Sequence, residues 1–165
     1  GFLTALYVIV VPFIAWAWTG RAPGAIVWGA VALSFAGTWL LGGGTYDTPA
    51  EPTRRYYDDV WSTADGITWK EVLAEAPWAP RQYHDVAWFD GRMWVLEGYN
   101  GDLGGNRQDV WYSQDGVSWY ELEGTPWPAR HASSVFVHDG SLWVVAGNNM
   151  TSDVWRLRAP PEPPR

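Results

Sequence analysis

Two arginines, each followed closely by a histidine, are the residues of this sequence best placed to do chemistry. Arg81 and Arg130 stand shortly after a proline in two similar segments, with His84 and His131 behind them. A guanidinium can bind a carboxylate through two parallel hydrogen bonds, so one hypothesis is a site for an acidic ligand. The alternative is structural, because a recurring buried arginine can bond loop carbonyls. The histidines lie three and one residues after their arginines, and this unequal spacing predicts no shared metal site.

Acidic and amide side chains supply a second set of candidates. Glu97 ends an apolar segment and is a weak candidate for a catalytic base, the alternative being a solvent-exposed rim residue. The stretch "NGDLGGNRQD" offers oxygen ligands for Ca²⁺ from Asn100, Asp102, Asn106 and Asp109, although ordinary loop composition explains it equally well. The absence of cysteine excludes thiolate catalysis and disulfides. We predict neither a metal nor a cofactor.

Tryptophan is unusually frequent, with 14 residues. Trp78 and Trp127 lie in two "PW" segments between predicted sheets, where we expect exposed rings suited to stacking on a sugar or peptide. The other repeating tryptophans fall at equivalent positions and are expected to fill the space between sheets. These structural positions, together with two repeating glycines, are Trp61, Trp69, Trp94, Gly98, Trp111, Trp119, Trp143, Gly147 and Trp155.

An internal repeat organises the second part of the chain. "DDVWSTADGITWKEV" at 58–72 matches "QDVWYSQDGVSWYEL" at 108–122, and a third copy begins as "SDVWRL" at 152–157. Residues 76–100 match 125–149 in the same way. Alternating Val, Trp and Tyr predict strands over roughly 84–90, 92–98, 109–114 and 117–122. The Asp-Gly pairs between them predict tight hairpin turns.

This pattern resembles kelch repeats, whose blades contain four antiparallel strands in about 50 residues. The resemblance implies an all-β fold of about two propeller blades over residues 45–158, in an incomplete ring, with one complete blade at 84–122. Kelch repeats usually end the second strand in a glycine pair, whereas here the pairs are Glu97-Gly98 and Ala146-Gly147. The proline-rich residues 159–165 predict an extended tail.

The first 44 residues differ sharply from the rest. All 18 acidic residues follow Gly44, and the only basic residue before it is Arg21. Two uncharged runs, at about 2–18 and 25–41, predict a two-helix transmembrane hairpin within residues 1–44. The segment "GFLTALYVIVVPFIAWAWTGRAPGAIVWGAVALSFAGTWLL" resembles the fourth and fifth helices of EamA-type drug/metabolite transporters. A single hairpin cannot form an alternating-access pathway, so the resemblance implies no transport residue here.

The two resemblances overlap at Thr38–Gly43, because the kelch register needs a strand where the transporter pattern ends a helix. We predict the helix through about Leu41, ended by the following glycines, and therefore a seam between two unrelated pieces. A single loop arginine places residues after Gly44 outside the cytoplasm by the positive-inside rule; without a native hairpin the chain is expected to be soluble.

The functional prediction is a kelch-type binding module, a fragment or fusion product attached to a membrane hairpin, with a protein or carbohydrate ligand. One alternative is a sugar-processing kelch enzyme of epimerase or hydrolase type. Another is an extracytoplasmic sensor appended to a transporter. The net charge of −7 argues against nucleic acid as a partner.

Overall fold

A computed structural model describes residues 38–50, 52–148 and 150–158. The helix predicted over 2–18 and most of the one predicted over 25–41 lie outside these residues, as does the tail at 159–165. In the part that is described, no helix has the length and apolar character needed to cross a membrane. The chain forms two compact units, one of Gly1–Leu40 with Trp61–Glu71 and one of Leu41–Val60 with Val72–Arg165.

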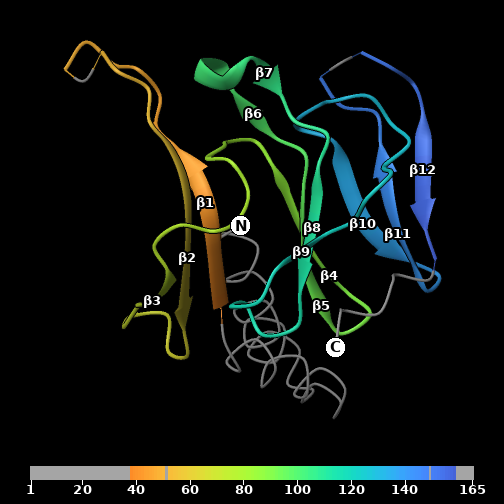
Figure 1. Ribbon diagram of the computed structural model, residues 1–165, viewed down its shortest axis with the longest axis horizontal. Helices are drawn as coiled ribbons and strands as arrows, with labels where there is room; N and C mark the ends of the chain where they lie inside the picture. The colour runs from red at the N-terminus through yellow and green to blue at the C-terminus, as the bar shows by residue number, and fades with distance from the viewer. Residues whose placement is uncertain (1–37, 51, 149, 159–165) are drawn as a thin grey trace, which may run out of the picture. The chain divides into compact units, whose positions relative to one another are not determined.

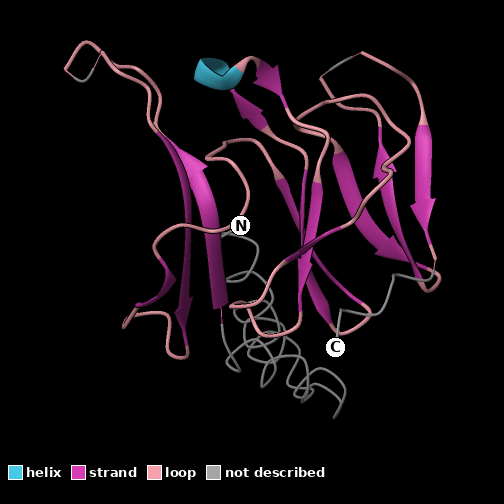
Figure 2. Ribbon diagram, in the orientation of Figure 1, coloured by secondary structure: helices cyan, strands magenta, loops and turns pink. Residues whose placement is uncertain are grey.

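The described chain is all-β, with antiparallel sheets (Figures 1 and 2). One sheet has the order β1-β2-β3, a second β4-β5-β8-β9 and a third β10-β11-β12, while β6 and β7 form a short ribbon. The strands are β1 (Thr38–Gly44), β2 (Tyr56–Thr63), β3 (Lys70–Leu73), β4 (Asp85–Phe89), β5 (Arg92–Leu96), β6 (Tyr99–Asn100), β7 (Gly105–Asn106), β8 (Val110–Ser113), β9 (Tyr120–Glu121), β10 (Ser134–His138), β11 (Ser141–Val145) and β12 (Val154–Leu157). A 3-10 turn, η1 (Gly101–Leu103), joins β6 to β7.

The four strands predicted between residues 84 and 122 form one sheet in chain order, each within a few residues of its predicted bounds. Two-residue turns join β4 to β5 and β10 to β11. Asp90 and Gly91 adopt φ angles of 50° and 68°, and Asp139 and Gly140 adopt 47° and 61°. Positive φ at both central residues gives the turn a twist that matches the strands it joins, as predicted for Asp-Gly.

The Asp-Gly pair at 115–116 behaves differently, so the tight hairpin predicted there is wrong. β8 ends at Ser113 and β9 begins at Tyr120, which leaves a longer connection. Asp115 Oδ1 accepts hydrogen bonds from the amides of Val117 and Ser118, at 2.9 and 2.7 Å. The aspartate side chain therefore satisfies loop amides, a role that aspartate commonly has in turns.

The helix predicted to run through Leu41 is wrong for Thr38–Leu41, which belong to strand β1. Gly42 and Gly43 adopt φ angles of 56° and 128°, close to those of Glu97-Gly98 (60° and 117°) and Ala146-Gly147 (53° and 127°). The amide of Gly43 donates to Arg81 O at 3.2 Å, and that of Thr45 to Arg55 O at 2.9 Å. These pairings fix the stretch as a strand with a twisted end, so the glycine pair shapes a strand terminus and does not stop a helix.

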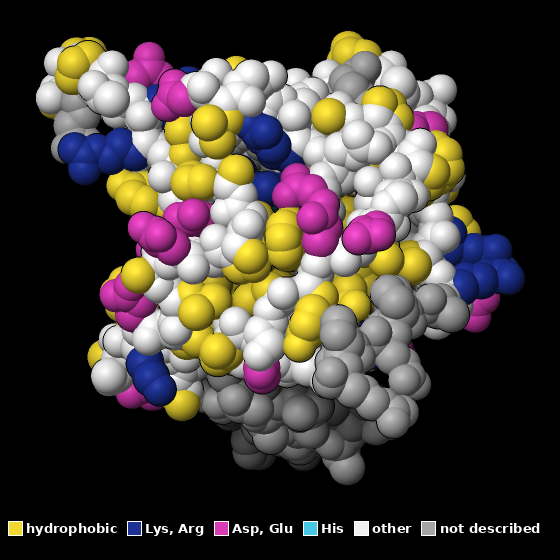
Figure 3. Space-filling view, in the orientation of Figure 1, with side chains coloured by type: hydrophobic (Ala, Val, Ile, Leu, Met, Phe, Trp, Pro, Cys, Tyr) yellow, Lys and Arg dark blue, Asp and Glu magenta, His cyan; other side chains and the backbone are white. Residues whose placement is uncertain are grey.

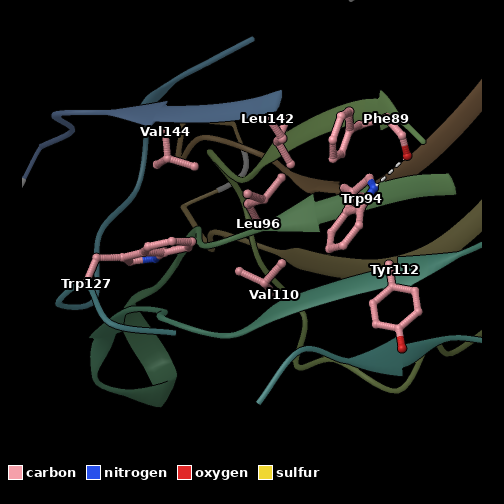
Figure 4. Close-up of a cluster of buried hydrophobic side chains, with 8 residues drawn as sticks. All are labelled: Phe89, Trp94, Leu96, Val110, Tyr112, Trp127, Leu142 and Val144. Atoms are coloured by element: carbon pink, nitrogen blue, oxygen red, sulfur yellow. Dashed lines mark hydrogen bonds between the residues drawn. The ribbon is translucent and has the colours of Figure 1, made fainter. Parts of the chain in front are cut away.

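A continuous apolar core lies between the sheet β4-β5-β8-β9 and the sheet β10-β11-β12, which lie side by side in Figure 1. Its buried members are Phe89, Trp94, Leu96, Val110, Tyr112, Trp127, Leu142 and Val144. Figure 4 shows these side chains converging, with the Trp94 indole N–H donating to Phe89 O at 3.0 Å. The hydrophobic effect therefore joins the two sheets, and the loops at their ends hold the candidate functional residues.

Candidate functional site

Arg81 and Arg130 occupy equivalent positions ahead of β4 and β10, and their side chains are 1% and 0% exposed. Arg81 donates from Nε to Ala79 O at 2.9 Å and from Nη1 to Glu97 O at 2.8 Å. Arg130 donates from Nη1 to Ala146 O at 2.6 Å, the equivalent carbonyl of the next sheet. Both guanidinium groups thus lie beneath loop carbonyls, the structural alternative of the sequence analysis.

Each arginine also binds an aspartate through two parallel bonds. Arg81 contacts Asp109 at 2.8 and 2.7 Å, and Arg130 contacts Asp153 at 2.8 and 2.6 Å. The same aspartates accept the indole N–H of Trp111 and Trp155, each at 2.6 Å. The bidentate sites that were candidates for a ligand carboxylate are therefore filled by the chain itself.

These bonds govern the protonation of the aspartates. Burial opposes ionisation of Asp109, but hydrogen bonds and charge from Arg81 lower its pKa overall. The hydrogen bonds from Arg130 hold the pKa of Asp153 well below its usual value. Neither aspartate was predicted as the partner of an arginine, although the repeated "DVW" contained the signal, since each aspartate stands two residues before a repeating tryptophan.

Glu97 is completely buried, so it is not the solvent-exposed rim residue favoured from the sequence. Its Oε2 accepts a short hydrogen bond from the Ser133 hydroxyl, and its Oε1 lies 3.7 Å from Arg130 Nε. The Ser133 amide donates to Asp85 Oδ2 at 3.1 Å. Burial raises the pKa of Glu97 to about 7 and that of Asp85 to about 6. Glu97 thus lies in a polar junction between the ends of β5 and β10, where a ligand cannot touch it.

The two histidines have different environments, in line with their unequal spacing. His84 Nε2 lies 2.6 Å from the Leu41 carbonyl, and burial lowers the pKa of this histidine. His131 Nδ1 lies 2.6 Å from Asn106 Oδ1, and burial lowers its pKa as well. Since a carbonyl oxygen and an amide oxygen only accept, the contacting nitrogen of each neutral ring carries the proton.

Trp78 and Trp127 are 2% and 7% exposed, so the prediction of exposed stacking rings is wrong for both. Trp78 packs edge-on against Trp119, with ring centroids 4.6 Å apart, and Trp127 lies 6.1 Å from Trp155. Each "PW" connection folds its indole back against a repeating tryptophan, because a large apolar ring gains more by burial than by stacking in solvent. These rings are core residues.

An aromatic cluster that the sequence analysis missed lies on the loops. Tyr83 stacks on His131 at 5.3 Å and 25°, and Tyr99 packs on the same imidazole at 5.1 Å. Tyr46 lies 6.1 Å from Tyr83, and Arg54 lies over the Tyr46 ring. The rings of Tyr83, Tyr99 and His131 are half-buried. We call Tyr46, Tyr83, Tyr99, Asn106 and His131 the loop cluster. Its members come from three loops and from the β6–β7 ribbon, an arrangement that no local spacing in the sequence reveals.

The calcium hypothesis receives no support from the loop geometry. Asn100 Oδ1 accepts from the amides of Asp102 and Leu103 and caps η1, while Asp109 is engaged with Arg81. Among the described residues, no three His, Asp or Glu side chains converge as metal ligands. The oxygen-rich loop is therefore accounted for by its own hydrogen bonds.

Comparison with known protein families finds no match, and comparison with curated proteins finds none either. Among solved structures, one described as "Structure of YjhT" is similar, with a TM-score of 0.47 and 23% sequence identity. The similarity covers 54% of this chain and 28% of that one, so the matched part is under a third of the solved chain.

Proposed function

We propose that this chain is part of a kelch-type β-propeller that acts as a binding module, with the loop cluster as its ligand surface. The observation that carries the proposal is the stack of Tyr83 and Tyr99 on His131, half-exposed at the loop ends of two sheets. Three aromatic rings from separate segments of the chain are held together there, and each ring is partly exposed. The sheets beneath supply the rigid support that a binding surface needs.

The chemistry of the cluster fits a neutral carbohydrate. Aromatic faces stack on the apolar face of a sugar ring, and His131 Nε2 remains an acceptor for a hydroxyl while Nδ1 is bonded to Asn106. Arg81 and Arg130 are occupied by Asp109 and Asp153, so the two strongest candidates for holding an acidic ligand are taken. The net charge of −7 also disfavours anions. A protein ligand is the competing outcome of the test.

The test is binding of the purified chain to an array of neutral oligosaccharides, followed by calorimetry with the best one. We expect Tyr83→Ala to weaken binding about tenfold through the lost stacking. Alanine is tolerated there, because Ala132 stands at the equivalent position with a φ of 53° against 56° for Tyr83. The matched control is Trp88→Ala, which removes an aromatic ring that is 60% exposed on β4. Unchanged affinity in Tyr83→Ala, or binding to no oligosaccharide, would contradict the proposal.

We also propose that the module is attached to a membrane hairpin of transporter type. The support is in the sequence alone, in the two uncharged runs of 17 residues on either side of Arg21. In that arrangement the acidic repeats lie on the extracytoplasmic side, where a carbohydrate ligand would be met. The sensor alternative differs only in requiring the rest of a transporter.

A further inference from the structure

Glu97 differs from the residues at the equivalent positions of the neighbouring sheets. The three positions share a left-handed backbone, with φ angles of 56° at Gly42, 60° at Glu97 and 53° at Ala146. This conformation is unfavourable for residues other than glycine, and at Glu97 it carries a carboxyl group that is 0% exposed. Other acidic side chains are visible at the surface (magenta in Figure 3), as is usual for charged groups. Residues with a strained backbone cluster at functional sites.

The Glu97 side chain bridges the junction between β5 and β10. At the preceding junction His84 reaches the neighbouring sheet directly, with its Nε2 2.6 Å from Leu41 O. Ser133 occupies the position equivalent to His84 in the repeat and has a much shorter side chain. Its hydroxyl forms a short hydrogen bond with Glu97 Oε2. Glu97 therefore supplies from the neighbouring sheet the reach that the serine lacks.

The hydrogen bonds around Ser133 favour a protonated Glu97. The serine hydroxyl has one proton but lies within hydrogen-bond distance of two acceptors, Glu97 Oε2 and, at 3.3 Å, Ala146 O. A proton on Glu97 Oε2 lets the carboxyl donate to Ser133 Oγ, and the hydroxyl is then free to donate to the carbonyl. An ionised carboxylate instead competes with that carbonyl for the single proton of the serine.

Among the described residues, the cations that face Glu97 are already paired. Arg130 Nε lies 3.7 Å from Glu97 Oε1, beyond hydrogen-bond distance, and this guanidinium binds Asp153 through two bonds. Arg81 bonds the main-chain carbonyl of Glu97 and is paired with an aspartate of its own. Asp85 and Asp153 add negative charge, and burial raises the pKa of Glu97 to about 7. Since Oε1 has no hydrogen-bond partner in the described part of the chain, we expect an ionised Glu97 to leave the junction for water.

Ser133 ties together the two segments that present rings of the loop cluster. Its amide donates to Asp85 Oδ2 at 3.1 Å. Asp85 stands two residues after Tyr83, and Ser133 stands two residues after His131. Between them, the Ala132 amide donates to Tyr83 O at 3.0 Å. The stack of Tyr83 on His131 therefore depends on two backbone segments that Ser133 helps to hold in register.

We propose that Glu97 is a positioning residue for the loop cluster, whose protonated carboxyl fixes Ser133 and, through it, the spacing of Tyr83 and His131. Ionisation of Glu97 releases this link, so the loop cluster binds its ligand more weakly in alkaline than in mildly acidic solution. The inference rests on the proposed function, because it concerns the regulation of the same surface. Glu97 touches no ligand in this role, in agreement with its burial.

Amide hydrogen exchange tests the positioning without any ligand. In the parent chain we expect the protection factor of the Ala132 amide, corrected for the intrinsic pH dependence of exchange, to fall about fivefold or more from pH 6.5 to pH 8. The reference is the Leu122 amide, which bonds Val110 O away from the junction and should change less. A loss of global stability alone would lower both protection factors equally, and that result would contradict a local role for Glu97.

Two substitutions separate the loss of the proton from the loss of the side chain. Glu97→Gln keeps a donor toward Ser133 and should give high protection of the Ala132 amide at both pH values. Glu97→Ala removes the link and should give low protection at both. Alanine is tolerated there, because Ala146 has a φ of 53° at the equivalent position. Equal protection in the two variants, or a pH dependence in Glu97→Gln like that of the parent chain, would overturn the inference.

Calorimetry with the neutral oligosaccharide identified on the array tests the consequence for binding. We expect the affinity of the parent chain to fall about fivefold or more from pH 6.5 to pH 8, and that of Glu97→Gln to change less than about twofold. Burial lowers the pKa of His131, so this ring stays mostly neutral over the range and does not produce the difference. Equal affinities of the parent chain at the two pH values would overturn the link to binding. If no oligosaccharide binds, the proposed function fails, whereas the exchange measurement still decides the role of Glu97.

Discussion

Arg81 joins three strand ends through one buried side chain, bonding two loop carbonyls and both oxygens of Asp109. Removing one partner of such a pair leaves the other charge with too few bonds. We expect Arg81→Met to lower the free energy of unfolding by about 3 kcal/mol, measured by urea denaturation. Arg54→Met is the control, because Arg54 and Asp47 form an exposed pair and little change is expected. A similar small loss of stability in both variants would show that the bonds of Arg81 contribute little to the stability of the fold.

Glu97 should make stability depend on pH. Its pKa rises from 4.5 to about 7 on folding because the carboxyl is buried, although Ser133 and Arg130 act in the opposite direction, and Asp85 and Asp153 raise it further. Between these values the folded chain binds more protons than the unfolded one, so stability is lost as pH rises from about 4.5 to about 7. The full effect is up to about 3 kcal/mol.

Glu97→Gln removes this titration and retains the shape of the side chain. The parent chain loses stability between pH 5 and pH 8, and the variant should lose less. We therefore expect the urea midpoint of the variant, relative to that of the parent chain, to be higher at pH 8 than at pH 5. The pKa of Asp85, raised to about 6 by burial, contributes in the same direction in both proteins. If the difference between the urea midpoints of the two proteins is the same at pH 5 and pH 8, Glu97 is already ionised in the folded chain at pH 5.

Two glycines at strand ends differ in how much space surrounds them, although both have a positive φ angle. Gly98 has a φ of 117°, and a Cβ added there would lie 3.0 Å from Arg81 Cδ and His84 Cβ. Gly91 has a φ of 68° in the β4–β5 turn, with open space around it. We expect Gly91→Ala to cost about 1 kcal/mol and Gly98→Ala about 3 kcal/mol, because only the second combines backbone strain with overpacking. Thermal melting of the two variants measures the difference, and equal losses would contradict the packing argument.

The sequence predicts the strands that have a regular alternating pattern. The predictions that are wrong, for β1, Trp78 and Trp127, have physical reasons. Alternation and Asp-Gly pairs located β4, β5, β8 and β10–β12, because strand period and turn conformation are local properties. The β1 strand was mistaken for a helix end, because "TWLL" is apolar enough for either and only pairing with distant residues decides between them. Trp78 and Trp127 were misplaced for a related reason, since their burial depends on a fold-back contact with another repeat.

The candidate site was harder to predict than the fold. Arg81 and Arg130 stand out in the sequence because they recur, and each donates to a loop carbonyl in the structure. The loop cluster cannot be found from the sequence, because Tyr46, Tyr83, Tyr99 and His131 come from separate segments of the chain and have no common spacing. Repetition in a sequence marks what every sheet needs to fold. A ligand surface is built from what differs between repeats, and only the assembled loops reveal it.

At the scale of the whole chain, strand β1 moves the boundary between the two sequence types. The charge pattern placed it at Gly44, but β1 begins at Thr38, and Leu41 already accepts a hydrogen bond from His84 while Gly43 bonds Arg81. A division at Gly44 would remove a strand from the first sheet. The seam inferred at Thr38–Gly43 therefore lies at the start of the repeats, and the apolar sequence before it is the part to test for membrane binding.

The last prediction compares the full chain with one beginning at Thr38, in the presence of liposomes of neutral phospholipid. Two uncharged 17-residue runs are long enough to enter a bilayer, whereas the acidic repeats have no reason to bind neutral lipid. We expect the full chain to float with liposomes through a density gradient and to resist carbonate extraction, and the shorter chain to remain at the bottom. Replacing Val8 and Val31 by Asp in the full chain should weaken flotation, because a carboxylate near the centre of each run is costly in hydrocarbon. Flotation of the shorter chain would instead assign membrane binding to the repeats, and extraction of the full chain by carbonate would contradict a spanning hairpin.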